Sequence, residues 1–249
     1  MLRGCFVTGT DTEVGKTGVS AALLHLLGAN GERAAGLKPV AAGLSLIDGR
    51  RVNEDVQALR AAGSLALSDA EVGPCQLEIA CAPHIAAALE GRVIKRSELL
   101  QAAQALAGRC DWLVVEGVGG FRVPLGADWD SADLAVDLGL PVVLVVGLRL
   151  GCLSHTLLSA EAVLARGLRL AGWVANGIDP AMLQPEDNLA TLNHWLGGRY
   201  QVPCLGVIPW LAAPHPAAMA AHLDAPALYA ALQPIPLSLI SPSPSTEPS

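Results

Sequence analysis

A glycine-rich segment near the start of the chain carries residue types that bind polyphosphates. From Gly9 to Thr17 it reads Gly-Thr-Asp-Thr-Glu-Val-Gly-Lys-Thr, with apolar residues before and after it. A tight turn between a strand and a helix directs successive backbone N–H groups to one point, beside the positive end of the helix dipole. Lys16 adds a mobile cation for the outer phosphates, and the Thr17 hydroxyl is the usual ligand of the accompanying Mg²⁺. We therefore predict that a nucleoside triphosphate binds here.

The spacing of this P-loop departs from the standard pattern. Five residues, Thr10 to Val14, separate Gly9 from Gly15, whereas the usual motif has about four. A predicted strand before the loop and a predicted helix after it favour nucleotide binding. The alternative is a decayed loop that no longer binds a nucleotide.

Two charged residues stand where predicted strands end. Lys38 follows an apolar run and precedes Pro39, and Glu116 follows the apolar run Trp112–Val115. A carboxylate that leaves a buried strand needs a cation, and Mg²⁺ held by Thr17 would supply one. Lys38 would be a second cation facing the phosphates. The alternatives are a solvated lysine at a strand end, and a capping or ion-pairing role for Glu116.

Two further polar residues are candidates on the same reasoning. Asp55 lies near a predicted helix start, where carboxylates often serve only as caps. Asn176 ends a predicted strand before Gly177. Its amide could pair with N6 and N7 of adenine, although asparagine before glycine is also an ordinary turn signal.

The elements that must position these residues follow from the apolar pattern. Residues 142–146 are apolar on both faces, which predicts a strand in the middle of a covered parallel sheet. Strands alternating with helices after an N-terminal P-loop predict an α/β fold of the P-loop NTPase type. It is a doubly wound, mostly parallel sheet with helices on both faces and ligands at the carboxyl ends of the strands. The predicted strands are 5–8, 35–40, 111–116, 141–147, 170–176 and 204–208, and the predicted helices are 16–28, 53–62, 96–107, 131–138, 153–166 and 186–196.

We expect a single domain over residues 1–232, because α/β sheets of this size often form one unit. Residues 233–249 are rich in proline and serine. They have too little apolar surface to order themselves, so a disordered tail is predicted.

Composition argues against several classes of partner. The net charge of −7 and the scattered basic residues disfavour binding to nucleic acid or to an anionic membrane. No apolar run approaches the roughly 18 residues of a membrane-spanning helix, and a secretory signal is not evident, so we expect a cytoplasmic protein. The cysteines form no Cys-x-x-Cys pair and the histidines show no zinc-type spacing. We predict reduced, mostly buried thiols.

Taken in order, eight segments resemble the dethiobiotin synthetase family, over about residues 5–223. The P-loop reading is close to diagnostic for this family. The segments are Gly9–Thr17, Lys38–Val40, Pro83–Ile85, Val115–Gly120, Val145–Gly147, Leu150–Cys152, Gly172–Asn176 and Gly206–Leu211.

The resemblance implies a reaction: ATP-dependent carboxylation of 7,8-diaminononanoate with CO₂, closing a ureido ring in the synthesis of biotin. In the family, an amine captures CO₂ as a carbamate, the carbamate oxygen attacks the γ-phosphate, and the second amine displaces phosphate from the mixed anhydride. Mg²⁺ is implied, but no organic cofactor. Phosphoryl transfer of this kind depends on positioning and charge neutralisation.

The resemblance also implies roles for individual residues. Lys38 and Lys16 would be catalytic, and Mg²⁺ would be held by Thr17, Asp55 and Glu116. The substrate would meet Lys38, Ala42, Gly119, Gly151 and Ser154, the last two contributed by the neighbouring subunit of a homodimer. ATP would be bound by Glu13, Val14, Gly15, Lys16, Thr17, Gly18, Asp55, Glu116, Gly117, Val118, Gly119, Asn176, Gly177, Pro209, Trp210 and Leu211.

The chain departs from the family pattern at two positions. The family commonly has a serine after Lys-Pro-Val-Ala, where this chain has Ala42, and an asparagine where this chain has Ser154. Serine can still cap a helix and form hydrogen bonds. Both positions contact the substrate in the family, so we expect the two differences to change the affinity for diaminononanoate more than the affinity for ATP.

Two other readings remain. A switch ATPase of the partition or septum-placement type shares the scaffold, but such proteins carry a lysine where this chain has Asp11, and no basic amphipathic helix ends the chain. A related ATP-dependent enzyme could act on another substrate. The cobyrinate type usually adds a glutaminase domain, which is not expected after residue 223.

Overall fold

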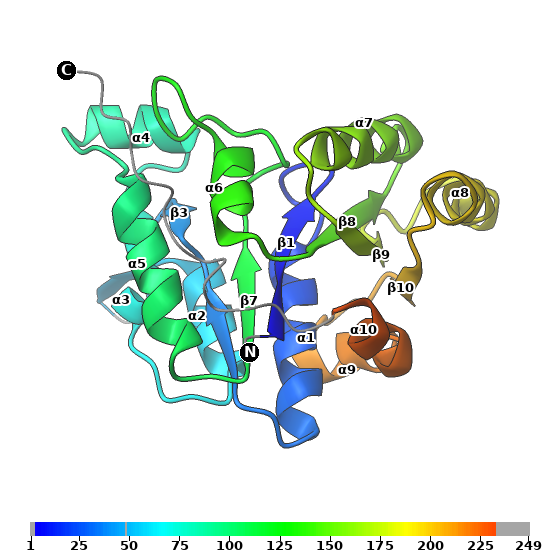
Figure 1. Ribbon diagram of the computed structural model, residues 1–249, viewed down its shortest axis with the longest axis horizontal. Helices are drawn as coiled ribbons and strands as arrows, with labels where there is room; N and C mark the ends of the chain where they lie inside the picture. Colours follow the sequence, from blue (N-terminus) through cyan, green and yellow to red (C-terminus); the bar gives the residue numbers. More distant parts are fainter. Residues whose placement is uncertain (1–2, 48, 233–249) are drawn as a thin grey trace.

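A six-stranded sheet forms the centre of the protein, for which the computed structural model describes residues 3–47 and 49–232. The strand order is β10-β9-β8-β1-β7-β2, and neighbouring strands are parallel (Figure 1). This confirms the predicted α/β class and all six predicted strand positions. The strands are β1 (Arg3–Gly9), β2 (Ala34–Leu37), β7 (Trp112–Glu116), β8 (Val142–Leu148), β9 (Leu170–Gly177) and β10 (Cys204–Ile208).

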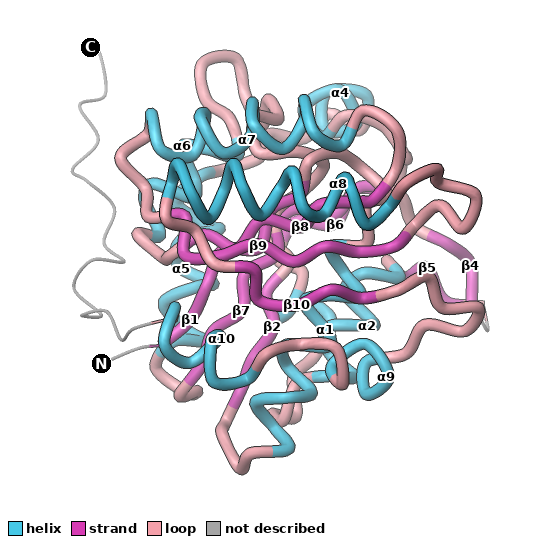
Figure 2. Tube along the Cα trace, turned by 90° about the vertical axis from the view of Figure 1, so that its right-hand side faces the viewer, coloured by secondary structure: helices cyan, strands magenta, loops and turns pink. Residues whose placement is uncertain are grey.

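Helices cover both faces of the sheet, as predicted for a doubly wound fold. One face carries α1 (Lys16–Ala29), α2 (Glu54–Ala62), α9 (Pro216–Ala220) and α10 (Ala225–Ala231) (Figure 2). The other carries α6 (Ser131–Leu138) and α7 (Cys152–Ala165), with α8 (Pro185–Leu192) packed against α7. The helix α5 (Arg96–Ala107) packs against β7 and α6.

The core lies where the aliphatic strands meet these helices. All seven residues of β8 are buried, and β8 pairs with β1 on one side and β9 on the other. Side chains on both faces of such a strand lose contact with water, which accounts for its uninterrupted apolar sequence. The order of strands puts the ends of β1, β7 and β2 side by side, and these ends carry the predicted site residues.

The predicted strand 35–40 was wrong in its extent. The strand β2 ends at Leu37, and the backbone N–H of Lys38 donates to the carbonyl of Val72 instead of a sheet partner (2.7 Å). Pro39 has no N–H to continue the ladder. The chain then forms β3 (Val40–Ala42), which pairs in parallel with β6 (Cys75–Leu77) in a separate small sheet. This bend releases Lys38 from the strand.

The predicted helix 186–196 also differs from the structure. The α-helical part is α8, after which residues 193–199 form a π-helix that contains Gly197 and Gly198. Several short elements were not predicted, because each is too short for a periodic pattern. They are β3, β6, β4 (Ser45–Ile47), β5 (Arg50–Val52), α3 (Asp69–Val72), α4 (Pro83–Leu89), α9 and α10. The predicted disordered tail, 233–249, lies outside the described residues.

Candidate active site

The P-loop joins β1 to α1 and holds two residues in the left-handed backbone region. These are Gly15, at the N-cap of α1 (φ 86°), and Glu13 (φ 60°). Glycine reaches this region without steric cost, whereas glutamate does so only under strain. The Lys16 ammonium donates to the backbone carbonyl of Asp11 (2.8 Å), so the lysine folds back over its own loop.

Four predicted site residues meet at the ends of β2 and β7. The Lys38 ammonium lies 2.6 Å from Glu116 Oε1 and 2.9 Å from Asp55 Oδ2, and it also donates to the carbonyl of Gly117 (3.1 Å). The hydroxyl of Thr17 lies 2.8 Å from Asp55 Oδ1 and 2.7 Å from Glu116 Oε1. A buried cation is therefore compensated by two carboxylates, one of which is fully buried.

The structure separates the roles that the sequence left open for these carboxylates. The N-cap of α2 is Asn53, whose side chain accepts from the N–H of Val56 (3.1 Å). Asp55 is in the first turn and reaches across to Thr17 instead of capping its own helix. Glu116 does form an ion pair, but its partner is Lys38, another predicted site residue.

Burial and neighbouring charges shift the pKa values of the cluster. Burial, and after it repulsion by Lys38, lower the pKa of Lys16 to about 8 in spite of the attraction of Glu116 and Asp55. Burial also opposes the charge on Lys38, but attraction by Glu116 and Asp55 outweighs it and raises the pKa. The pKa of Asp55 is lowered, because Lys38 and Thr17 stabilise its carboxylate more than burial destabilises it.

The oxygen atoms of Thr17, Asp55 and Glu116 suit a hard cation such as Mg²⁺. Glu116 Oε2 is buried and has no hydrogen-bond partner among the described residues, so it can accept a further ligand. Across 3–47 and 49–232, no three His, Cys, Asp or Glu side chains form a metal cluster. Mg²⁺ typically uses one or two carboxylates together with substrate phosphates and water, which matches this donor set.

A cavity of about 880 Å³ extends from the P-loop past this cluster. Its lining includes Lys16 and Thr17 of the P-loop and also Ala42 and the segment Ala80–Pro83. Lys38, Val118 and Gly119 line the same cavity. The volume is large enough for a polyphosphate and a second small molecule, and Lys38 lines the space that they would share.

A second pocket, of about 310 Å³, shares Gly15 with the large cavity. Predicted nucleotide residues line it, together with Met219 of α9, which was not predicted: Gly15, Gly18, Asn176, Gly177, Pro209, Trp210 and Leu211. The Asn176 amide donates to the carbonyl of Val14 (3.0 Å) and so supports the loop. Trp210 is half exposed. An apolar and aromatic slot next to a phosphate loop suits a nucleobase.

Two predicted substrate residues lie away from both cavities. Gly151 is the N-cap of α7 and Ser154 is in its first turn, and both are exposed. The structure does not bring them to Lys38 within this chain.

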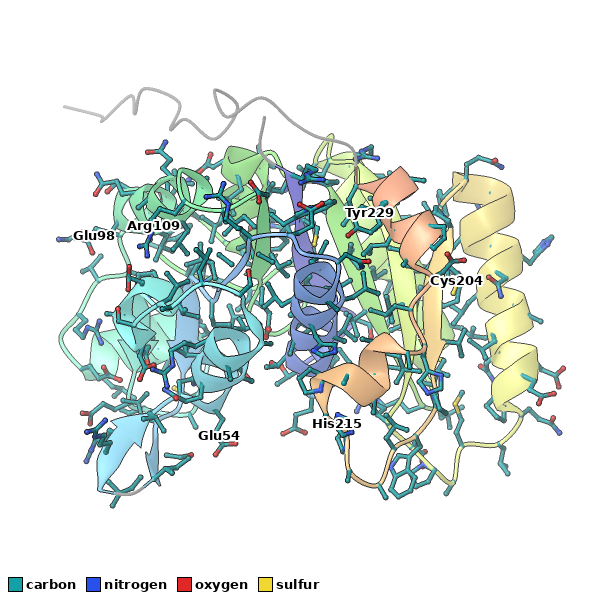
Figure 3. The ribbon with its side chains drawn as sticks, turned by 90° about the horizontal axis from the view of Figure 1, so that it is seen from below. Glu54, Glu98, Arg109, Cys204, His215 and Tyr229 are labelled. Carbon is teal, nitrogen blue, oxygen red and sulfur yellow. The ribbon has the colours of Figure 1, made fainter. Side chains whose placement is uncertain are left out.

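Sequence reasoning missed several residues of the site. Arg149 forms an ion pair with Asp11 of the P-loop. Cys81 lines the large cavity, and Met219 the smaller one. Cys81 could have been suggested by its position just before the Pro83–Ile85 segment. The position of Met219 depends on how α9 docks beside α1, which Figure 3 shows near the labelled His215.

None of the described helices is long and apolar enough to cross a membrane. Solved structures support the fold alone. The septum site-determining protein MinD complexed with Mg-ADP from Pyrococcus horikoshii aligns with 84% of this chain and 82% of its own, at a TM-score of 0.50 and 20% identity. A ParA family ATPase from Chlorobium tepidum aligns with 92% of this chain and 100% of its own, at a TM-score of 0.50 and 10% identity.

Comparison with protein sequences identifies the family as well as the fold. The AAA domain family matches residues 3–218. The ATP-dependent dethiobiotin synthetase BioD of Aromatoleum aromaticum is 52% identical over 224 residues, which cover 90% of this chain and 98% of that protein. Identity of this level over nearly both whole chains, together with the P-loop and the converging lysines and carboxylates, shows that the chain belongs to the ATP-dependent dethiobiotin synthetase family.

Proposed function

We propose that this protein forms dethiobiotin from 7,8-diaminononanoate, CO₂ and ATP, releasing ADP and phosphate, in the synthesis of biotin. Its family membership supports this reaction. The structural observation that carries the proposal is Lys38, a buried cation that lines one cavity together with P-loop residues and Ala42.

Lys38 is proposed to act on the carbamate and on the γ-phosphate. Its ammonium would orient the carbamate oxygen for attack and stabilise the negative charge that gathers on the transferred phosphoryl group. The raised pKa keeps this ammonium protonated at neutral pH. Lys16 would leave the Asp11 carbonyl and bind the β- and γ-phosphates, whose charge would raise its pKa.

Thr17, Asp55 and Glu116 are proposed to hold Mg²⁺, directly or through water. The ion would neutralise phosphate charge when bound. The segment Glu13–Gly18 is proposed to surround the phosphates, and Glu116–Gly119 to border both nucleotide and substrate. Asn176 and Gly177 would meet the adenine together with Pro209–Leu211.

The substrate is proposed to lie between Lys38, Ala42 and Gly119. Its carboxylate would reach Gly151 and Ser154 of a neighbouring subunit, since both residues are exposed at the start of α7. Apolar side chains near that helix are also exposed, notably Leu150 and Leu158. A homodimer would cover them. We propose a cytoplasmic location, where ATP and the small-molecule substrates are available.

The test is to measure dethiobiotin and phosphate formation by the purified protein with ATP, Mg²⁺, bicarbonate and 7,8-diaminononanoate, omitting each component in turn. Equal amounts of both products, dependent on every component, are expected. Phosphate release that does not respond to the diamine would overturn the proposed substrate but leave the nucleotide site in place.

Ala42 favours one second candidate, an ATPase of the same family acting on a related substrate. Its methyl group cannot make the hydrogen bond of a serine, and Ala42 lines the same cavity as Lys38. The variant Ala42→Ser distinguishes the candidates. A lower KM for 7,8-diaminononanoate supports the first function, whereas no response to this diamine in either protein supports the second.

A further inference from the structure

The P-loop carries a carboxylate on the wall of the cavity that is proposed to hold the phosphates. Asp11 lines this cavity, and its side chain is half exposed. Its Oδ1 accepts the N–H of Thr12 (2.8 Å), so the carboxylate is turned toward the loop backbone. A negative group in a loop that binds a polyphosphate would repel the ligand unless a cation neutralised it.

The cation is supplied by a neighbouring strand. Arg149 directly follows the end of β8, which pairs with β1 up to Val145 and Gly9. Its guanidinium forms an ion pair and hydrogen bond with Asp11 Oδ2. Arg149 does not line the cavity itself. It contacts the cavity lining through the pair with Asp11, so its charge would act on the phosphates through that residue.

Asp11 is held at two groups by two different cations. Its backbone carbonyl accepts from the Lys16 ammonium, and its carboxylate pairs with Arg149. When Lys16 moves to the phosphates, the Arg149 pair would still hold the loop and neutralise its carboxylate. We propose that Arg149 is a positioning residue for ATP binding, whose main effect is to cancel the charge of Asp11. This inference rests on the proposed ATP-dependent function.

The first test is the variant Arg149→Gln, which removes the charge but keeps a polar side chain. We expect the Kd and KM for ATP to rise about tenfold, as for one uncompensated charge near a polyphosphate in a partly screened site. The rate at saturating ATP should change less than about twofold, because Arg149 does not touch the reacting groups. Arg149→Lys keeps the charge and should keep most of the affinity.

The second test is rescue. If repulsion by Asp11 causes the defect, then Asp11→Asn in the Arg149→Gln background should restore most of the ATP affinity, although it removes the last charge of the pair. The difference between wild type and Arg149→Gln should also shrink as ionic strength rises from about 0.05 to 0.5 M. A purely structural role for Arg149 predicts neither result.

A matched control is Arg33→Gln. Arg33 forms a similar half-exposed pair with Asp111, at the opposite end of the strands. Its loss should leave the ATP affinity unchanged. Wild-type affinity in Arg149→Gln, or a double variant no better than Arg149→Gln, would overturn this inference alone. Failure of the wild-type protein to bind ATP would instead overturn the proposed function.

Discussion

Lys38 is buried only because two carboxylates surround it. Lys38 as a whole residue is 3% exposed, and its ammonium lies against Glu116, which is fully buried. Removing one partner of such a pair leaves an uncompensated charge in a medium of low dielectric constant. The same residue is thus important for the proposed reaction and for the stability of the fold.

The variant Lys38→Met should still bind ATP, because the P-loop and the base pocket are intact. Dethiobiotin formation at saturating ATP should fall by a factor of about 10² to 10³, the usual cost of losing one preorganised charge at a transition state. The measurement is single-turnover kinetics beside ATP titration by calorimetry. Near-normal turnover would remove Lys38 from the catalytic role.

Lys38→Met should also lower the free energy of unfolding by about 3 to 5 kcal/mol in the absence of Mg²⁺ and ATP, since Glu116 loses its counter-ion. Adding Glu116→Gln should recover part of this loss without recovering activity. Urea denaturation of the single and double variants measures both effects. If Glu116→Gln instead lowered the free energy of unfolding of Lys38→Met still further, the burial of Glu116 would not depend on Lys38.

The cysteine thiols differ in how readily a reagent in solution can reach them. Burial raises the pKa of Cys5 to about 12, and burial together with nearby Asp111 raises that of Cys110 to about 11, so both thiols stay protonated at pH 8. Cys81 is half-buried on the cavity wall. Iodoacetamide at pH 8 should label Cys81 well before Cys5 and Cys110.

Mg-ATP and the diamine should slow the labelling of Cys81, because they would fill the cavity that gives access to it. Peptide mass spectrometry over time measures each rate. Cys204, half-buried elsewhere on β10, is the internal control and should keep its rate. Equal protection of both thiols would indicate a general tightening rather than occupation of the cavity.

At the scale of elements, long periodic segments were predictable and short ones were not. The strand β8 was placed in the middle of the sheet from its sequence alone, because a strand covered on both faces has no polar position. By contrast, the pairing of β3 with β6 joins residues 40–42 to 75–77 over only three positions. Such pairs are stabilised by tertiary contacts, which no local pattern records.

The candidate site divides in the same way. Lys16, Lys38 and Glu116 could be grouped from sequence, because parallel strands bring their carboxyl ends to one edge. The pairing of Asp11 with Arg149 could not, because it depends on side-chain directions in two loops. Met219 reaches Gly18 only because the short helix α9 docks on α1.

The docking of α9 on α1 can be tested at the contact between β10 and the segment that joins α9 to α10. A Cβ atom on Gly206 would lie 2.5 Å from the backbone carbonyl oxygen of His222, which cannot move as a flexible side chain would. Gly206→Ala should therefore lower the free energy of unfolding by about 1 to 3 kcal/mol and weaken ATP binding by displacing α9.

Gly108→Ala is the matched control, because Gly108 has an ordinary φ of −73° and a Cβ there would lie 3.8 Å from its neighbours. It should leave stability and ATP affinity nearly unchanged. Thermal unfolding with and without Mg-ATP measures both variants. If Gly206→Ala had the stability and ATP affinity of the wild type, the backbone around His222 would be able to move away from the added methyl group without cost.

For the whole molecule, the proposed ligand would join distant parts of the chain. Two lysines and four acidic residues line the proposed phosphate cavity of a protein whose net charge is −7, so an anionic ligand would need Mg²⁺ as an additional cation there. At an ATP concentration 100 times its Kd, binding should stabilise the protein by about 2.7 kcal/mol. Hydrogen exchange should slow in the P-loop and in residues 206–220, while α5 stays unchanged.

The base pocket joins Gly18, near the start of the chain, to Met219, near the end of its described part. The P-loop therefore leaves the ribosome long before the residues that would receive the base. The strand before it, β1, lies between β7 and β8 in the sheet, so it has no neighbours on either side until both of those strands have been synthesised. A nascent chain thus lacks part of the proposed base pocket until translation has passed α9, and the nucleotide would stabilise most those chains whose synthesis has reached that helix.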